Sequence, residues 1–299
     1  MNGMMNNIKV YIITSAKYEE CYIEEWVQYH LNIGFDKIII NDNNPKDYPY
    51  NPKDILKKYI DAGQVIIERY FDEHKYNENE NIDNIMPNIY WWLYEKYKDE
   101  FEWFAKLDID EYLEIHETNN IKQFLQQDKF NNVLSIVIPW DVYTVKNEYK
   151  KYYERLTYNR DKYIRMEYQW HSMWSFKSII RKTDLLFGIG LHYGHFLDSF
   201  HIKYSLSDGN DASKKLLICC EDTSDEEQFN HSEKCKDYIE NDLINKSCCI
   251  NHYGDCCIEE EVNRCIKFNC DTNNNWCRHE YYLELKEQYP EMFDKPRDL

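Results

Sequence analysis

Short apolar runs alternate with amphipathic stretches along the N-terminal part of the chain. Three runs rich in β-branched residues predict strands at residues 8–14, 37–41 and 64–70. Between them, apolar residues recur at helical spacing, which predicts helices over residues 19–33 and 52–62. This β-α-β-α-β order with short connections is typical of a mostly parallel sheet with helices on its faces.

Farther along, polar and tyrosine-rich stretches separate the apolar runs. Further helices are predicted over residues 85–99, 119–127, 258–269 and 278–288. Further strands are predicted at residues 102–107, 133–139 and 174–181. We expect a Gly/His-rich loop at 188–196 and a polar surface excursion at 208–233, and we find no clear period in 143–172. No repeat and no linker marks a second domain, so we expect one α/β domain with a mixed, mostly parallel sheet.

The sharpest chemical feature lies between Trp103 and Leu113, where an apolar run ends in three carboxylates, those of Asp108, Asp110 and Glu111. Clustered carboxylates repel one another and resist desolvation, so we expect a positive charge to meet them. Asp-x-Asp places two carboxylates on one side of an extended chain, and oxygen ligands suit a hard divalent cation. The alternative is a solvated acidic turn at the end of a strand.

Polar residues also follow the other predicted strands of this sheet. Those at the predicted carboxyl ends are Thr14, Asp42, Tyr70 and Asp108. Ligands of open α/β sheets bind outside the carboxyl ends of the parallel strands. The sequence therefore predicts that these four residues lie at one edge of the sheet, which favours a ligand site over a solvated turn for the acidic stretch.

Charge narrows the class of partner. The 299 residues include 54 acidic and 36 basic ones, a net charge of −18, so the chain would repel phosphate backbones and anionic lipid surfaces. We therefore expect no nucleic-acid partner.

No apolar stretch reaches the ~18 residues of a membrane-spanning helix, and the N-terminus lacks the basic and apolar regions of a signal peptide. We expect a cytoplasmic protein without a transmembrane segment, and the sequence does not indicate its oligomeric state.

Cysteine is concentrated in the C-terminal part, where ten of the eleven cysteines lie between Cys219 and Cys277. In a chain without a secretion signal, reduced thiols are the expected state. The run Cys265-x4-Cys270-x6-Cys277-x-His279 is an alternative zinc set, although the familiar Cys-x2-Cys pairs are absent.

Several blocks of residues, taken together and in order, resemble a known family. The early blocks are Glu24-Glu25-Trp26-x-x-Tyr29-His30-x-x-x-Gly34, Ile40-Asn41-Asp42-Asn43-Asn44 and Leu107-Asp108-Ile109-Asp110-Glu111-Tyr112-Leu113. The later ones are Pro139-Trp140, Phe176-Lys177-Ser178-Ile179-Ile180-Arg181, His192 and Asn251-His252-Tyr253. Over roughly residues 8–270, this series resembles the GT-A glycosyltransferases of the family 2-like and family 92-like groups. The bias toward Asn, Lys, Ile and Tyr is typical of an AT-rich coding genome, such as that of a giant DNA virus (which would place the protein in the host cytoplasm) or an AT-rich bacterium.

The resemblance implies a GT-A fold with three parts: a nucleotide-binding half at 1–115, an acceptor-binding half at 116–255, and C-terminal helices at 256–299. It implies an inverting transfer of a hexose or modified hexose from a UDP-sugar to a hydroxyl of a glycan or glycoprotein acceptor. The implied cofactor is Mn²⁺ or Mg²⁺, since a divalent cation stabilises the charge that develops on a departing diphosphate.

The resemblance also implies roles for individual residues. The implied metal ligands are Asp108, Asp110 and His252, with Asp108 acting through water or on the ribose. The implied donor-binding residues are Thr14, Asp42, Asp108, Lys177 and Arg181, the first two at the uracil and ribose and the two cations at the pyrophosphate or the acceptor. The alternative for His252 is a core histidine bonded to backbone, and for the cations a solvated place in an alternating strand.

An inverting transferase needs a general base that takes the proton of the acceptor hydroxyl. Asp141, directly after a buried predicted strand, is the first candidate, and His192 is the second, followed by His195 and Asp198. Asp141 departs from the small residues expected beside the family's tryptophan.

Two other classes of function stay open at this level. Another metal-dependent nucleotide-processing enzyme, such as a nucleotidyltransferase, would use the same acidic pocket, but the chain has no Walker-type or GxGxxG phosphate loop. A non-catalytic protein that binds sugar nucleotides or glycans on the same fold would tolerate loss of the carboxylates, yet Asp108, Asp110 and Glu111 are all present.

Overall fold

The computed structural model describes most of the chain as far as Asp255. The described residues are 8–20, 22–74, 82–145, 163–165, 176–192, 194–197, 204–212, 238–255, 283, 286–288 and 290. Outside them lie Asp198, the acidic run 221–227, the Cys265–His279 zinc set, the predicted helix 258–269 and most of the predicted helix 278–288.

The N-terminal half is the predicted parallel sheet. Its strands are β1 (Val10–Ala16), β2 (Lys37–Asp42), β3 (Val65–Glu68) and β4 (Trp103–Lys106), in the order β3-β2-β1-β4. Its helices are α1 (Ile23–Asn32), α2 (Pro52–Ile55), α3 (Lys57–Asp61), α4 (Tyr70–Glu73) and α5 (Ile82–Tyr97). All three pairings between these strands are parallel. The predicted helix 52–62 is two short helices separated at Leu56.

The same sheet continues beyond β4 with mixed pairing. Its next strands are β8 (Phe176–Arg181), β6 (Ser135–Val145), β12 (Cys248–Asp255) and β5 (Glu111–Ile115). Strand β8 is antiparallel to both of its neighbours, β12 is parallel to β6, and β5 is antiparallel to β12. Two short strands, β7 (Tyr163–Arg165) and β11 (Tyr204–Leu206), also pair with β6. The described residues thus confirm a mixed α/β fold with a largely parallel sheet and flanking helices.

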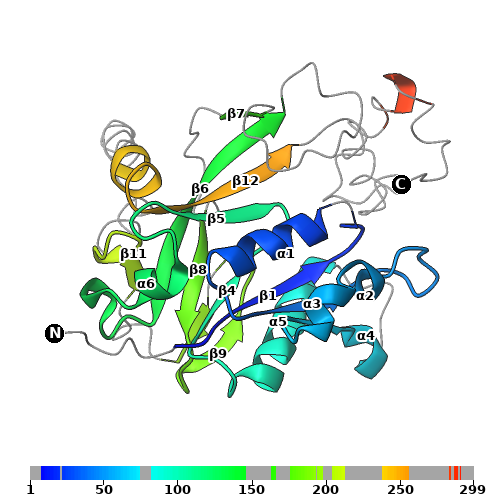
Figure 1. Ribbon diagram of the computed structural model, residues 1–299, viewed down its shortest axis with the longest axis horizontal. Coiled ribbons are helices and arrows are strands. Elements are labelled where there is room, and N and C mark those ends of the chain that lie inside the picture. The colour runs from blue at the N-terminus through cyan, green and yellow to red at the C-terminus, as the bar shows by residue number, and fades with distance from the viewer. Residues whose placement is uncertain are drawn as a thin grey trace.

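Other short helices follow β5 and precede β12: α6 (Ile121–Leu125), the 3₁₀ helix η1 (Asp128–Phe130) and the π-helix η5 (Ile239–Ile244). Figure 1 shows α2, α3 and α4 on the right of the view and α6 and β11 on the left, with the strands between them.

The core follows from the alternation of side chains along the strands. In β1, Ile12 faces the cluster that holds Trp26 of α1, whereas Ile13 faces the cluster that holds Tyr90 of α5. The sheet is therefore buried on both faces, which explains why its strands are continuous apolar runs. No helix among the described residues is long and apolar enough to cross a membrane.

Two expectations from the sequence are wrong. Residues 188–196 are not simply a loop, because β9 (Leu186–Ile189) and β10 (Gly194–Phe196) form an antiparallel pair. A Cβ atom on Gly194 would lie 2.7 Å from Leu186 Cδ1, so the glycine serves close packing of this pair. The other error concerns Thr14, which is not at a strand end, because β1 continues to Ala16.

Candidate functional site

The acidic stretch forms a tight turn between β4 and β5. The strand β4 ends at Lys106, and β5 begins at Glu111. The Glu111 amide donates to the Asp108 carbonyl at 3.1 Å, and the Asp108 amide donates to Glu111 Oε2 at 2.9 Å. These reciprocal bonds hold the three carboxylates in one place, at the carboxyl end of a parallel strand as predicted.

The positive charge that the sequence required at Asp108 comes from two buried lysines. Asp108 Oδ1 accepts a hydrogen bond from Lys106 Nζ at 2.8 Å, and its Oδ2 accepts one from Lys177 Nζ at 2.6 Å. Burial would raise the pKa of Asp108, but the two ammonium groups outweigh it and hold that pKa well below its usual range. Both oxygens of Asp108 are therefore bound to lysines, so the action of Asp108 on a metal through water or on the ribose, which the resemblance implied, stays a prediction.

Lys177 is also fully engaged. Besides Asp108, its ammonium donates to the Leu191 carbonyl at 3.2 Å and lies 3.4 Å from Glu111 Oε1. The contact with Glu111 is an ion pair without a hydrogen bond, and the Lys177 side chain is 2% exposed. The prediction that Lys177 contacts the pyrophosphate is not supported by this arrangement, in which the lysine stabilises the turn.

Glu111 and Lys106 have shifted pKa values because the cluster is buried. Burial raises the pKa of Glu111 to about 7, against the opposing effect of Lys177. Burial lowers the pKa of Lys106 to about 8, and repulsion from Lys177 adds to that shift. The Lys106 ammonium also lies 4.9 Å from the centroid of the Tyr90 ring on α5.

Asp110 contacts His252, which is far away in the chain. Its Oδ2 lies 3.7 Å from His252 Nε2, and the two side chains are 26% and 20% exposed. The Tyr253 amide donates to the Asp110 carbonyl at 3.0 Å, which fixes β12 against the turn. The His252 ring stacks on Trp140 of β6, with centroids 4.3 Å apart and planes 19° from parallel. The structure thus brings together the predicted pair Asp110 and His252, through residues far apart in the chain.

A cleft lies at the carboxyl end of β2, at the same edge of the sheet as the acidic turn. Asp42 forms an ion pair there with Arg69 and accepts the amide of Asn44 at 3.0 Å. The two residues border a cleft of about 300 Å³, lined by Asp42, Asn44, Pro45, Lys46, Tyr48, Tyr50, Asn51, Lys53, Arg69 and Asp72. Asp42 therefore lies beside a cavity, as a donor-binding residue must.

Thr14 and Arg181 do not lie where the predicted donor site requires them. Thr14 is completely buried inside β1. Arg181 pairs in register with Trp103, the first residue of β4, and donates to the Phe130 carbonyl at 3.1 Å. Because Asp108 follows the other end of β4, Arg181 is at the far edge of the sheet. Neither residue can contact a ligand at the carboxyl edge in this structure.

The two candidate bases differ in position. Asp141 follows Trp140 in β6 and so faces the opposite side of the sheet, where it accepts Arg165 Nε at 2.5 Å and Tyr143 Oη at 2.8 Å. His192 lies on the Trp140 side, with its ring centroid 5.6 Å from that of Trp140. Burial lowers the pKa of His192 to about 4. The ring is neutral near pH 7, and its Nδ1 bonds the Phe176 carbonyl at 2.9 Å.

Sequence reasoning missed two cations of this edge, Lys106 and Arg69. Lys106 interrupts a buried apolar strand two residues before Asp108, and that interruption was a usable signal for a buried ion pair. Arg69 carries no comparable signal, because a cation at the end of a half-buried strand is common.

Comparison with known proteins finds only loose similarities. No family model matches the chain, and no curated protein matches it in sequence. Galactosyltransferase LgtC in complex with donor and acceptor sugar analogues is 10% identical with a TM-score of 0.34, over 96% of this chain and 98% of that one. A glycosyltransferase involved in glycosylation of the major capsid of PBCV-1 is 16% identical with a TM-score of 0.28, over 58% and 60%. S. aureus TarS is 14% identical with a TM-score of 0.31, and the match spans 45% of this chain but 22% of TarS. With scores this low, these similarities do not establish a family or an activity for the chain.

Proposed function

We propose that the chain is a metal-dependent glycosyltransferase. It would transfer a hexose or modified hexose from a UDP-sugar to a hydroxyl of a glycan or glycoprotein acceptor, with inversion. The proposal rests on the ordered sequence motifs and on one observation, the 3.7 Å approach of Asp110 Oδ2 to His252 Nε2. The division into a nucleotide-binding half, an acceptor-binding half and C-terminal helices belongs to the same proposal.

The donor set at Asp110 and His252 fits the implied cation. One carboxylate oxygen and one imidazole nitrogen, both partly exposed and directed toward one another, suit Mn²⁺, and the carboxylate alone suits Mg²⁺. In this proposal Asp110 and His252 hold the cation, and when bound it would stabilise negative charge on the departing diphosphate. Asp108 would act indirectly, because both of its oxygens already bind lysines.

The surrounding residues would position this pair. The ion pairs of Asp108 with Lys106 and Lys177 keep the turn rigid, so that Asp110 projects toward β12. The Trp140 ring fixes the plane of the His252 imidazole by stacking. Rigid orientation of a ligand before the substrate binds is what lowers the cost of reaching the reactive geometry.

The nucleoside and the acceptor proton require other groups. The cleft beside Asp42 and Arg69 would take the nucleoside of the donor, since it lies at the carboxyl edge of the same parallel strands. As proton acceptor we favour His192 over Asp141. Its neutral ring lies on the Trp140 side of the sheet, whereas Asp141 is bound by Arg165 on the other side.

The test of the proposal is Asp110→Asn. With the unchanged protein, UDP should raise the thermal unfolding temperature only when Mn²⁺ is present, since ligand at 100 times its Kd adds about 2.7 kcal/mol. The variant should lose this Mn²⁺-dependent shift, and hydrolysis and transfer from UDP-sugars should fall by at least about 100-fold. Asp61→Asn is the matched control, because Asp61 is an exposed aspartate of α3 whose partner is the exposed Lys57.

Two results would contradict the proposal. Full activity of the Asp110→Asn protein would exclude Asp110 as a metal ligand. If no nucleoside diphosphate changes the unfolding temperature of the unchanged protein, a nucleoside-diphosphate sugar is excluded as the donor. Metal-dependent UDP binding without any turnover over a panel of UDP-sugars would instead support a non-catalytic binding protein.

A further inference from the structure

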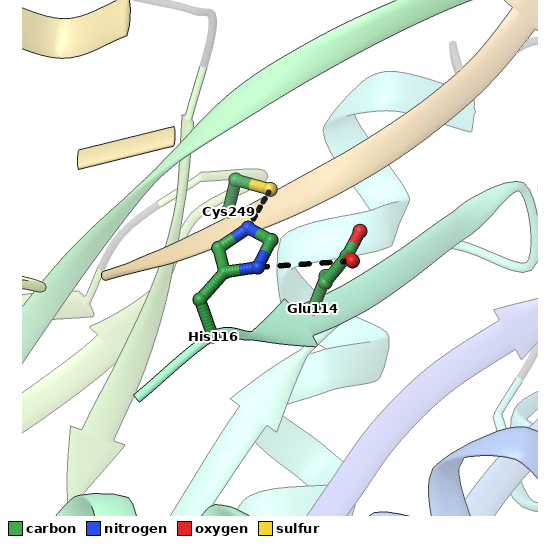
Figure 2. A group of neighbouring side chains, drawn as sticks. All are labelled: Glu114, His116 and Cys249. Carbon is green, nitrogen blue, oxygen red and sulfur yellow. Dashed lines mark hydrogen bonds and ion pairs between the residues drawn. The ribbon is translucent and has the colours of Figure 1, made fainter. Parts of the chain in front are cut away.

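A second group of metal-ligating side chains lies away from Asp110, where β5 meets β12. The group consists of Glu114, His116 and Cys249, whose ligand atoms all lie within 4.8 Å of one another. Figure 2 shows the imidazole of His116 between the Cys249 thiol and the Glu114 carboxylate. We propose that these three side chains bind one Zn²⁺ ion, or a transition-metal ion of similar preference, that ties the end of β5 to β12.

The backbone already holds the three residues in place. Glu114 and Cys249 are directly opposite one another in the antiparallel β5–β12 ladder. His116 follows the last residue of β5, and its amide donates to the Ser247 carbonyl at 2.9 Å. Because paired strands already hold these ligands in place, little conformational entropy is lost when an ion binds.

The ligand atoms of the three side chains lie somewhat farther apart than they would around one zinc ion. Cys249 Sγ lies 4.0 Å from His116 Nε2, and the other ring nitrogen, Nδ1, lies 3.8 Å from Glu114 Oε1. An imidazole gives one nitrogen to one ion, so the ring must turn to bring a single nitrogen between the thiol and the carboxylate, and one ligand atom from each residue already lies within 4.8 Å of the others. Zinc binds sulfur at about 2.3 Å and nitrogen or oxygen at about 2.0–2.2 Å, so tetrahedral ligand atoms are roughly 3.5 Å apart. Rotation of the partly exposed His116 and Glu114 side chains closes the difference, while solvent supplies a fourth ligand.

A neighbouring residue supports the carboxylate. Asn251 Nδ2 donates to Glu114 Oε2 at 2.6 Å, and Cys249 Sγ lies 3.6 Å from Asn251 Oδ1. Bonds of this kind orient metal ligands and are typical of metal sites. Because His116 is exposed while Cys249 is buried, an ion could enter from the His116 side.

The chemistry of the set separates it from the proposed site at Asp110. A thiolate with an imidazole selects zinc and similar ions, whereas oxygen-rich sites favour Mg²⁺ or Mn²⁺. Cys249 and His252 also differ by three positions in a strand, which places them on opposite faces of the sheet. The inference is therefore independent of the proposed transferase activity.

The test is metal binding by the full chain, with Zn²⁺ measured by competition against a chromophoric chelator and Co²⁺ by its thiolate charge-transfer absorption. Cys249→Ser and His116→Asn should each bind one equivalent less than the unchanged protein, or bind it more than ~100-fold more weakly. Cys248→Ser is the matched control, because Cys248 is adjacent and buried but pairs with Ile115 and faces the other side. Comparing variants with the unchanged chain removes the contribution of the other cysteines.

His116→Asn keeps the test valid if Cys249→Ser does not fold, since His116 is at the surface. The proposal is overturned if His116→Asn takes up as much Zn²⁺ as the unchanged protein with the same affinity. It is equally overturned if Cys248→Ser loses the same equivalent as Cys249→Ser. Loss confined to the Cys249 and His116 variants, with Mg²⁺ unable to compete for the site, supports it.

Discussion

At the scale of a single residue, His30 shows how burial decides a protonation state. The ring is completely buried in α1, and burial lowers the pKa of His30 from 6.5 to about 3. The Leu113 amide donates to Nε2 at 3.3 Å, so the proton of the neutral ring lies on Nδ1 and is donated to the Trp26 carbonyl at 2.9 Å. A protonated ring would break the bond to Leu113, because Nε2 could no longer accept.

The pH dependence of stability should therefore include a contribution from His30. Below about pH 6.5 the unfolded chain binds a proton at this residue that the folded chain does not bind until about pH 3. Stability should fall across this window as pH falls, by up to roughly 1.4 kcal/mol per pH unit. Urea unfolding of His30→Gln should show a flatter profile between pH 6.5 and 4 than the unchanged protein.

His74→Gln provides the control, because His74 is a half-buried histidine near the surface that stacks on Tyr70. It removes an imidazole outside the buried contact of α1 with β5, and its profile is compared with that of His30→Gln. An identical slope for His30→Gln and the unchanged protein would show that His30 is not the titrating group.

At the scale of an element, side chains of α1 form hydrogen bonds with the backbone edge of β5 that does not face β12. One edge of β5 pairs with β12, and three side chains of α1 bind the backbone of its other edge. Trp26 Nε1 donates to the Glu111 carbonyl at 2.7 Å, and Tyr29 Oη donates to the Leu113 carbonyl at 2.9 Å. His30 accepts the Leu113 amide. Trp26, Tyr29 and His30 lie on one face of α1, because their spacing is i, i+3, i+4. Their side chains satisfy backbone hydrogen bonds of the edge strand β5 and so fix the turn that carries the carboxylates.

Removing one of these bonds should weaken the fold without disturbing the core. Tyr29→Phe keeps the ring but leaves the Leu113 carbonyl without its donor, and should cost about 1–2 kcal/mol. Tyr70→Phe removes the same atom from a half-buried tyrosine that contacts His74 and Trp92 through its ring, and should change stability by less than about 0.5 kcal/mol. Chemical denaturation of both variants gives the comparison, and equal stabilities would refute the role assigned to the Tyr29 hydroxyl.

At the scale of the whole molecule, the sheet separates two cations that the sequence placed close together. Lys177 and Arg181 are at opposite ends of β8. Because β8 is antiparallel to β4, Lys177 reaches the carboxyl edge and Asp108, whereas Arg181 reaches the start of β4 and lies over the Trp103 ring at 4.5 Å.

The two positions should respond differently to the same substitution. Lys177→Met leaves the buried Glu111 without its counter-charge and the half-exposed Asp108 with Lys106 alone, and should cost about 3–5 kcal/mol in unfolding experiments. Arg181→Met removes a half-buried surface contact and should cost less than about 2 kcal/mol. The Arg181 variant should also keep any Mn²⁺-dependent response to UDP. Equal destabilisation by the two changes would contradict the buried role of Lys177.

The parallel half of the fold was predictable because local patterns specify it. Runs of β-branched residues and helical spacings depend on neighbours in sequence, and parallel strands with helical crossovers have few possible arrangements. The placement of Asp42 and Asp108 at one edge followed from that topology. The continuation through β8, β6, β12 and β5 was not predictable in the same way, because pairing between strands that are distant in the chain leaves no local signal.

By itself, the sequence determined that Asp108 needs a positive partner, since clustered carboxylates cannot be buried alone. Only the tertiary structure decided what that partner is. Lys177 of β8 and Lys106 at the end of β4 bind Asp108. Asp110 contacts His252 instead. The physical reason is that charges interact over a few ångströms in space, and distance in the folded chain is set by strand pairing that no local pattern encodes.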